Sequence, residues 1–524
     1  MVKGLSPISR KTLIPPLPYG RASVSGRSQD GGCSCYSMSA STLFHTVRHL
    51  KPVQIYRRIY RRRPTGSTPC VGIREATGHW VPVIKRENPR TGARTFRFLN
   101  EVRQIKTWND PGIPKLWLYN LHYFEHTEPH LMREWVRENQ PGHGNGWEPY
   151  PLSLRIVNWI KSGLPLDEES LATQAQYLSE SVEYHLLANH LFANAKALVF
   201  AGTYFDCEPW LRQGLSILEE QIPEQILSDG GHFERSPMYH SIILEDLLDL
   251  ISLSHAYPGI LPDWSEPAAR MLSWLRQMSH PDGRISFFND AAFGVAPELR
   301  ELEAYADRLG IASAAVPLGD SGYVRLEGGQ TVVLFDAAPV GPDYQPGHAH
   351  ADSLSFEMSY RGQRLIANSG VSTYEAGPER LRQRGTAAHN TVRIDQRDSS
   401  EVWAGFRVGR RARPCGVSTD NHTWVEAAHD GYRPVIHRRR LELRPGHLLV
   451  TDLIEGSDRH EVAIFFHMFP SSDPNLIRLD SALERSVEDA TFHPQFNSSV
   501  ASKAVVGRWC GLLPVTFSTF VDLT

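Results

Sequence analysis

Several features of membrane-spanning and disulfide-stabilised proteins are missing from this sequence. Its 524 residues include six cysteines, which are scattered and form no CxxC pair, so neither a disulfide framework nor a zinc site of that type is expected. No run of about 18 apolar residues occurs, and no membrane-spanning helix is predicted. The residues after Met1 lack the uninterrupted apolar segment of a signal peptide. We expect a cytoplasmic location on this basis, with a periplasmic or secreted location left open.

Positive charge is not in excess either. The chain has 55 Lys and Arg residues against 58 Asp and Glu residues, for a formal net charge of −3. Nucleic-acid-binding proteins usually present strongly basic surfaces, so no nucleic-acid partner is expected. The sequence is instead rich in side chains that sugar-binding clefts use, with 12 Trp, 18 Tyr and 23 His. These residues favour a glycan-binding site, although aromatic side chains also fill protein cores.

The hydrophobic pattern divides the chain into regions. Residues 1–43 are rich in Ser, Gly and Pro and predict a disordered extension. The basic stretch 46–63 predicts a first helix, either solvated or lying on a membrane surface. Over residues 44–315, apolar residues recur at intervals of three and four between Gly and Pro turns, which predicts helices packed in pairs. Over residues 316–524 the interval becomes two, which predicts antiparallel strands. The predicted fold class is α+β and multidomain.

Two helical segments carry polar residues among apolar ones. In HLLANHLFANAKAL, His190 and Asn194 lie four residues apart and Asn189 precedes them, so these side chains need partners if they are buried. They form either an internal network between helices or part of a site. In DGGHFERSPMYH, Tyr239 follows Ser-Pro at a predicted helix start. It either packs beside a surface pair of Glu234 and Arg235 or contributes to the same site.

A third polar segment, GHAHADSLSFEM, lies in the predicted β region. His348 and His350 are two residues apart, so in a strand their side chains face the same side, and Asp352 extends that face. His389 opens a later predicted strand. Imidazoles on neighbouring strands suit either a divalent metal or an acid–base pair.

The segments ANHLFANAKAL, DGGHFERSPMYH, GHAHADSLSFE and GTAAHNTV, in this order, resemble the heparinase II/III family of polysaccharide lyases, with its heparinase-like glycosaminoglycan and alginate lyases. The resemblance runs from about residue 44 to the C-terminus. It implies an incomplete (α/α) toroid followed by an antiparallel β-sandwich domain, with a cleft between them. It also implies β-elimination at a 4-O-linked uronic acid, so that the expected partner is an acidic polysaccharide. The oligomeric state is left open.

The resemblance also implies residue roles. Asn189 matches the residue that neutralises the uronate carboxylate, Tyr239 the general acid and often base, and His348 the histidine that completes the pair. Because free tyrosine has a pKa of about 10, a tyrosinate base would need a nearby cation, for which Arg235 and Arg384 are candidates. The residues expected to bind substrate are His190, Arg235, His122, Trp147, Arg155 and Arg384.

A structural divalent metal, zinc or manganese, is a further implication of the resemblance. His350 and His389 match two ligands of the family, but the position of its aspartate ligand holds Asn368 here. A neutral amide oxygen is a weaker ligand than a carboxylate, so a lower affinity is expected. Asp352 either compensates for this change or hydrogen-bonds a ligand.

Two other functions stay open from the sequence. A glycoside hydrolase needs two carboxylates flanking the scissile bond, for which Glu234 with Glu148 or Asp229 are candidates. A non-catalytic glycan-binding protein in polysaccharide assembly needs no such pair. An unsaturated product of cleavage would distinguish the lyase from both.

Overall fold

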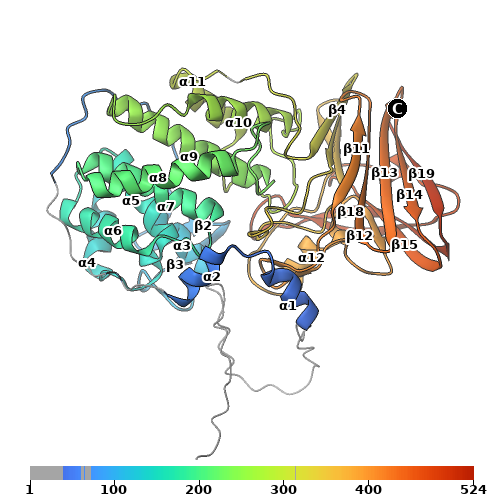
Figure 1. Cartoon of the computed structure of the whole chain (residues 1–524), viewed down its shortest axis with the longest axis horizontal. Coiled ribbons are helices and arrows are strands. Elements are labelled where there is room, and N and C mark those ends of the chain that lie inside the picture. Colours follow the sequence, from blue (N-terminus) through green and yellow to red (C-terminus); the bar gives the residue numbers. More distant parts are fainter. Residues whose placement is uncertain (1–38, 61–63, 65–71, 313, 524) are drawn as a thin grey trace, which may run out of the picture.

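The computed structural model describes residues 39–60, 64, 72–312 and 314–523, and Figure 1 shows their helices and strands in two neighbouring regions. Most of the predicted disordered extension, up to residue 38, lies outside the described residues. Its last residues do form structure, because Ser39 caps helix α1 (Ala40–Val47) by accepting a hydrogen bond from the Thr42 N–H at 3.0 Å. Helix α2 (Pro52–Ile59) follows within the basic stretch.

The helical region holds the segments whose apolar residues recur at intervals of three and four. Its helices are α3 (Lys115–Tyr123), α4 (Pro129–Glu138), α5 (Pro149–Lys161), α6 (Glu168–Ser181), α7 (Ala188–Tyr204), α8 (Glu208–Gln225), α9 (Pro237–Ala256), α10 (Ser265–Gln277) and α11 (Leu299–Arg308). Helices α7 and α9 are buried almost throughout. Two glycines let α7 and α8 approach closely, since a Cβ on Gly202 would lie 2.4 Å from the Leu211 nitrogen and one on Gly214 would lie 2.8 Å from the Ala195 oxygen.

A small antiparallel sheet precedes these helices, which the sequence pattern did not predict. It consists of β1 (Arg90–Gly92), β2 (Thr95–Phe98) and β3 (Glu101–Gln104). Its strands are too short to display a clear alternation of apolar and polar residues. Among the described residues, no helix combines the length and the apolarity that crossing a membrane requires.

The C-terminal region is built from antiparallel sheets, as predicted. One sheet contains β4 (Tyr323–Gly328), β5 (Thr331–Asp336), β6 (Phe356–Tyr360) and β7 (Gln363–Ile366). A second contains β8 (Val392–Ile394), β15 (Arg459–His467), β17 (Glu484–Phe492) and β18 (Val500–Leu512). The largest contains β11 (Pro414–Thr419), β12 (Trp424–Tyr432), β13 (Val435–Arg444), β14 (His447–Glu455), β16 (Ile477–Arg478) and β19 (Val515–Asp522). The short strands β9 (Val402–Trp403) and β10 (Arg407–Val408) form a separate pair.

One apolar core joins the three larger sheets. In β14, Leu448, Val450 and Ile454 alternate with more exposed neighbours and point inward, where they meet side chains such as Phe335 of β5 and Ile464 of β15. The fold class is therefore as predicted, a helical domain followed by an antiparallel β-sandwich domain. The predicted boundary at 315–316 falls in the connection between α11 and β4. One short helix, α12 (Pro378–Arg384), lies between β7 and β8 and was not predicted.

The connection between the two domains is held by Asp229. One of its carboxylate oxygens accepts hydrogen bonds from the Gly319 N–H at 2.9 Å, the Ser321 N–H at 2.9 Å and the Ser321 hydroxyl at 2.6 Å. The other oxygen accepts from the Gly231 N–H at 3.0 Å. Because Asp229 is buried, these donors replace the water that a carboxylate otherwise binds.

A second buried contact between the domains is made by Glu357 of β6. Its carboxylate lies 2.9 Å from Nε2 of His280, which follows α10, and its other oxygen accepts from the Phe287 N–H at 3.1 Å and the Asn368 N–H at 2.8 Å. The Nδ1 atom of His280 lies 2.7 Å from the Ser359 hydroxyl. These contacts fix the helical domain against the first sheet of the β domain.

Replacing Asp229 by alanine should destabilise the protein, because its buried donors would lose their charged acceptor. We expect the free energy of unfolding to fall by about 3 kcal/mol, as measured by denaturant titration. Asp307→Ala, at an exposed position near the end of α11, is the matched control and should change it by less than about 0.5 kcal/mol. Equal stability of the two variants would contradict the role given to Asp229.

Candidate functional site

A cleft of about 730 Å³ lies between the helical domain and the loops of the β domain. Side chains of α5, α7 and α9 line one wall, and residues 345, 347, 348, 374 and 403–407 line the other. Asn189, His190, Tyr239 and His348 all face this cleft. The cleft therefore draws its lining from both domains.

Helix starts position the residues of the helical wall. Asn189 lies in the first turn of α7, after Leu187 and Ala188 adopt positive φ values of 64° and 51° that turn the chain into the helix. Tyr239 lies in the first turn of α9, where the Ser236 hydroxyl accepts a hydrogen bond from its N–H at 3.2 Å. Each side chain is thus fixed at the beginning of a buried helix.

The three predicted catalytic residues meet in this cleft. The His348 ring stacks on the Tyr239 ring, with centroids 3.7 Å apart and an interplanar angle of 27°. Asn189 Nδ2 lies 3.5 Å from His348 Nε2 and donates to Glu234 Oε1 at 2.9 Å. The Tyr239 hydroxyl lies 3.1 Å from the Tyr374 hydroxyl. A sugar entering the cleft would therefore meet an amide, an imidazole and two phenols side by side.

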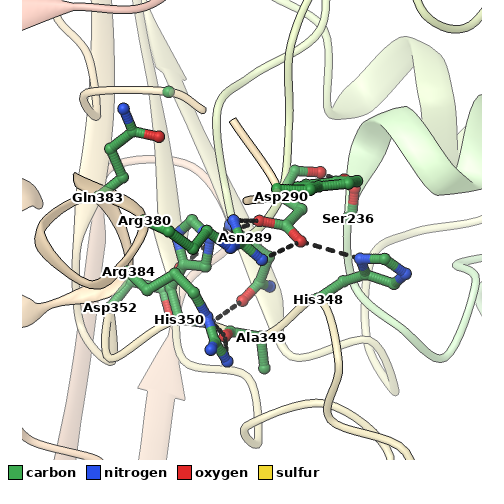
Figure 2. A network of polar contacts seen from close by, with 12 residues as sticks. Ser236, Asn289, Asp290, His348, Ala349, His350, Asp352, Arg380, Gln383 and Arg384 are labelled. Atoms are coloured by element: carbon green, nitrogen blue, oxygen red, sulfur yellow. Dashed lines mark hydrogen bonds and ion pairs between the residues drawn. The ribbon is translucent and has the colours of Figure 1, made fainter. Parts of the chain in front are cut away.

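Asp290 is a buried anion whose carboxylate contacts His348, His350 and Arg380 (Figure 2). One carboxylate oxygen lies 2.9 Å from His348 Nδ1 and accepts from Arg380 Nη2 at 2.7 Å. The other lies 2.8 Å from His350 Nε2 and accepts from Arg380 Nη1 at 2.5 Å. Burial would raise the pKa of the Asp290 carboxyl, but Arg380 and the two imidazoles hold it well below its ordinary value.

The ionised Asp290 determines the tautomer of His348. A carboxylate only accepts hydrogen bonds, so Nδ1 of His348 must carry the proton that the imidazole donates. In the neutral ring, Nε2 is then left with a lone pair, and this atom is the one near Asn189 and 3.6 Å from Glu234 Oε2. The arrangement suits a general base.

Tyr239, in contrast to His348, suits the donation of a proton. Burial raises the pKa of its hydroxyl well above the ordinary value, and Tyr374 and Asp290 raise it further. The phenol therefore carries its proton at neutral pH and suits a general acid. The pKa of the Glu234 carboxyl is also raised. Burial raises it, and His348 and Asn189 lower it by less than burial raises it.

The prediction that Arg235 or Arg384 lowers the pKa of Tyr239 is wrong. Arg235 donates to the Ser321 carbonyl at 3.0 Å and the Phe233 carbonyl at 2.9 Å. Arg384 is fully buried and donates to the Ala349 carbonyl at 2.9 Å. Both guanidiniums donate to backbone oxygens, and neither lines the cleft. The prediction that Arg235 and Arg384 bind substrate directly is therefore also wrong.

Three other residues predicted to bind substrate belong to the helical core. His122 accepts a hydrogen bond from the Trp135 indole at 2.9 Å, and burial lowers its pKa to about 3. Arg155 stacks over the Trp135 ring at 3.8 Å and donates to Gln174 at 2.8 Å. Trp147 packs in the same aromatic cluster. None of the three lines the cleft, so they support its wall from behind rather than contacting substrate.

His190 does lie at the cleft. Its Nδ1 atom is 3.0 Å from the Glu183 carboxylate, and its ring lies 4.5 Å from the ring of Tyr150. The role of His190 in substrate binding stays a prediction.

His350, Asp352 and His389 form a buried group whose donor atoms all lie within 4.8 Å of one another. This group replaces the predicted set, because the Asn368 oxygen already accepts from the Asn390 N–H at 3.1 Å and its side-chain amide at 3.2 Å. Asp352, rather than Asn368, could therefore supply the third ligand, an oxygen beside the two imidazole nitrogens. A carboxylate with two imidazoles is a suitable donor set for zinc or manganese.

The hydrogen bonds around His350 and His389 support a cation between them. His350 Nε2 faces the Asp290 carboxylate, and His389 Nδ1 lies 2.8 Å from the Gly385 carbonyl, so each of these nitrogens is inferred to carry the ring proton. The remaining nitrogens, Nδ1 of His350 and Nε2 of His389, face each other at 3.0 Å with lone pairs on both. Burial lowers the pKa of His350 to about 4 and that of His389 to about 3, so a proton does not bridge them at neutral pH.

Several residues of the site were not predicted from the sequence. Asp290 follows a run of apolar residues and an asparagine, without a motif of its own, and Arg380 lies in a short helix beside other arginines. Tyr374 lies in the polar segment that follows β7 but carries no distinguishing spacing. Only their positions in space identify them.

Two models of known protein families match the chain. The family model described as "Heparinase II/III-like, C-terminal" matches residues 311–504, and the one described as "Heparinase II/III N-terminus" matches residues 167–307. Together they cover more than half of the chain. The chain belongs to the heparinase II/III family. This is a family of polysaccharide lyases, and the N-terminal match covers α6 to α11 of the helical domain while the C-terminal match covers most of the β domain.

Individual relatives of this heparinase II/III family member are distant. A heparin-sulfate lyase of Bacteroides thetaiotaomicron is 26% identical over 358 residues, which cover 58% of this chain and 50% of that protein. The FtsZ-localized protein C of Caulobacter vibrioides is 27% identical over 360 residues, which cover 63% of this chain and 60% of that protein. The chain thus spans only between half and three-fifths of the length of these relatives.

Solved structures show the same fold. The crystal structure of heparinase III aligns with a TM-score of 0.62 and 18% identity, covering 81% of this chain and 79% of that one. The structure of a heparan sulfate lyase HepC mutant from Pedobacter heparinus aligns with a TM-score of 0.57 and 19% identity, covering 90% and 87%. At these identities the likeness establishes the architecture alone.

The metal group gives a prediction that separates Asp352 from Asn368. Asp352→Asn should lower the affinity for zinc or manganese by at least about tenfold, because a charged ligand becomes neutral. Asn368→Ala is the control and should keep the metal. Elemental analysis of the purified proteins and a metal titration measure both effects. Loss of metal from Asn368→Ala, with retention in Asp352→Asn, would restore the ligand set expected from the sequence.

Proposed function

We propose that this protein is a polysaccharide lyase that cleaves a uronic-acid-containing polysaccharide, of the glycosaminoglycan or alginate type, by β-elimination. The observation that carries the proposal is the stacked pair of Tyr239 and His348 at the cleft, with Asn189 beside it. Membership of a lyase family supports the same reaction class. The heparin-sulfate lyases among the relatives favour a glycosaminoglycan.

Binding of the uronate carboxylate is the first requirement of this reaction. The Asn189 amide is a donor at the cleft, and Glu234 positions it from behind by accepting a hydrogen bond from Asn189 Nδ2 at 2.9 Å. The Glu234 Oε2 atom is buried and has no hydrogen-bond partner among the described residues. Donors to the carboxylate withdraw negative charge from it and make the proton on C5 more acidic.

The proton transfers then follow from the protonation states. His348 Nε2 takes the proton from C5, the electrons of that bond form the C4–C5 double bond, and the bond from C4 to O4 breaks. Tyr239 gives its proton to O4, so that the leaving chain departs as an alcohol. Asp290 stabilises the imidazolium that forms on His348, because it already binds the Nδ1–H. Return of the proton from His348 to Tyr239, directly or through water, restores the enzyme.

The metal group has a structural role in this proposal. A divalent ion held by His350, Asp352 and His389 would supply positive charge between the facing nitrogens. His350 also contacts Asp290, so the same residues position the carboxylate that orients His348.

A hydrolase is less well supported. Of the two carboxylates considered as partners for Glu234, Asp229 binds the connection between the domains, and Glu148 accepts a hydrogen bond from Lys115 at 2.8 Å. Neither lines the cleft, so no flanking pair of carboxylates forms with Glu234 from these residues.

Incubation with heparan sulfate, chondroitin, hyaluronan and alginate tests the proposal. Cleavage of one of them should generate the ultraviolet absorbance of an unsaturated uronate. New reducing ends without this absorbance would indicate hydrolysis and contradict the lyase assignment. Binding without any cleavage would favour the non-catalytic alternative.

Tyr239→Phe tests the assignment of the general acid. The change keeps the stacked ring and removes only the hydroxyl, so kcat should fall by roughly 10²-fold or more while the protein stays folded. Tyr177→Phe, in α6 and outside the cleft lining, is the control and should retain activity. Full activity of a folded Tyr239→Phe variant would remove Tyr239 from the mechanism.

A further inference from the structure

The outer surfaces of α1 and α2 are unusually apolar. Twelve large hydrophobic side chains are exposed among the described residues, and six of them lie on these two helices and the residue after them. We call this set the N-terminal apolar face, and it consists of Phe44, Val47, Ile55, Tyr56, Ile59 and Tyr60. Figure 1 shows both helices at the edge of the molecule, near where the two domains meet.

The opposite sides of the two helices are firmly bound to the protein. Thr42 donates to the Glu401 carboxylate at 2.6 Å, and the Trp403 indole donates to the Thr46 hydroxyl at 3.2 Å. Lys51 forms an ion pair with Glu224, and Gln54 is buried and donates to the Tyr344 carbonyl at 3.3 Å. The N-terminal apolar face is therefore the outward side of anchored helices. The ring contacts of its aromatic residues in the described part of the chain are local, such as those between Phe44 and Arg48 and between Tyr56 and Tyr60, and its side chains stay exposed.

The sequence around these helices is rich in basic residues. Residues 31–74 contain eight Lys and Arg residues and no Asp or Glu, in a chain whose net charge is −3. Arg48 and Arg57 are exposed on the helices, and Arg410 and Arg413 are exposed next to them. Arg410 donates to the Ser41 hydroxyl at 3.0 Å, and the pKa of His49 is lowered first by burial and then by nearby arginines that include Arg413. These four arginines have no ion pair with a carboxylate in the described part of the chain.

Exposed apolar side chains next to exposed arginines favour some binding partners over others. A second copy of the chain would bring a basic surface against a basic surface, which repulsion opposes. An acidic polysaccharide would pair with the arginines but leave the isoleucines in water. A bilayer that contains anionic lipids accepts both, since aliphatic side chains enter the acyl boundary, tyrosines lie at the headgroup level and arginines meet the phosphates.

We infer that the N-terminal apolar face docks this protein on the surface of a membrane that contains anionic lipids. Both helices lie in the plane of the interface in this arrangement, as amphipathic basic helices do. The surface lies outside the residues that line the cleft, so docking is independent of the proposed lyase reaction.

Co-sedimentation of the full chain with vesicles tests this inference. The protein should bind vesicles of phosphatidylcholine with about 30% phosphatidylserine far more tightly than vesicles of phosphatidylcholine alone. Ile55→Gln with Ile59→Gln should weaken this binding by about tenfold or more. Arg48→Gln with Arg57→Gln should weaken it by about fivefold for each arginine at low salt.

The β domain offers a matched control for the isoleucines. Val487 and Leu512 are 42% and 70% exposed, against 42% and 68% for Ile55 and Ile59. Val487→Gln with Leu512→Gln should leave vesicle binding unchanged. Turnover of a soluble polysaccharide should be the same in both double variants, because neither pair lines the cleft.

Four outcomes would overturn the inference. The first is an absence of binding to the phosphatidylserine vesicles, and the second is equal loss of binding in the isoleucine variant and its control. The third is retention on an immobilised acidic polysaccharide that depends on the arginines but not on the isoleucines, without vesicle binding. A dimer in solution that the isoleucine variant abolishes would likewise assign the face to a second copy of the chain.

Discussion

The buried ion pair of Asp290 and Arg380 is the interaction on which the site depends. A carboxylate away from water is tolerated only with a matched cation and a full set of donors, and Arg380 supplies the cation through two hydrogen bonds. The two remaining contacts of the carboxylate go to His348 and His350. One anion thus orients the imidazole that faces the cleft and the imidazole of the candidate metal group. The protonation state of either imidazole therefore affects the other imidazole through Asp290.

This ion pair also explains how two domains form one site. Asp290 follows α10 in the helical part of the chain, whereas His348, His350 and Arg380 come from the β part. Ser236, which caps the helix carrying Tyr239, donates to the Asp290 carbonyl at 2.5 Å. Tyr239 on α9 and His348 on the β domain are therefore both positioned through the segment around Asp290. The hydrogen bonds of Asp229 and Glu357 also hold the two domains together.

Much of this arrangement could be predicted from the sequence. The change in hydrophobic interval separates the domains because burial on one face imposes a different spacing on a helix and on a strand. Asn189, Tyr239 and His348 were identified through ordered motifs, and they lie together. Arg155 and His122 were misread, because a polar side chain in an apolar segment has the same appearance whether it reaches a cleft or a buried partner. Arg384 was a candidate cation and Arg380 was not considered, because the spacing of the three arginines on this short helix does not reveal which guanidinium meets Asp290.

The two N-terminal helices make contacts with both domains. Helix α1 is bound to Glu401 and Trp403 of the β domain, and Lys51 at the start of α2 is bound to Glu224 of α8. Only residues 48–51 lie between the helices, and a fully extended chain from Val47 to Pro52 spans at most about 18 Å. The helices thus act as a short tether. Moving α8 away from the β domain would break the contact of Lys51 with Glu224 and the hydrogen bond from the Tyr344 hydroxyl to Glu224 at 2.9 Å, so these side chains restrain the separation of the two domains.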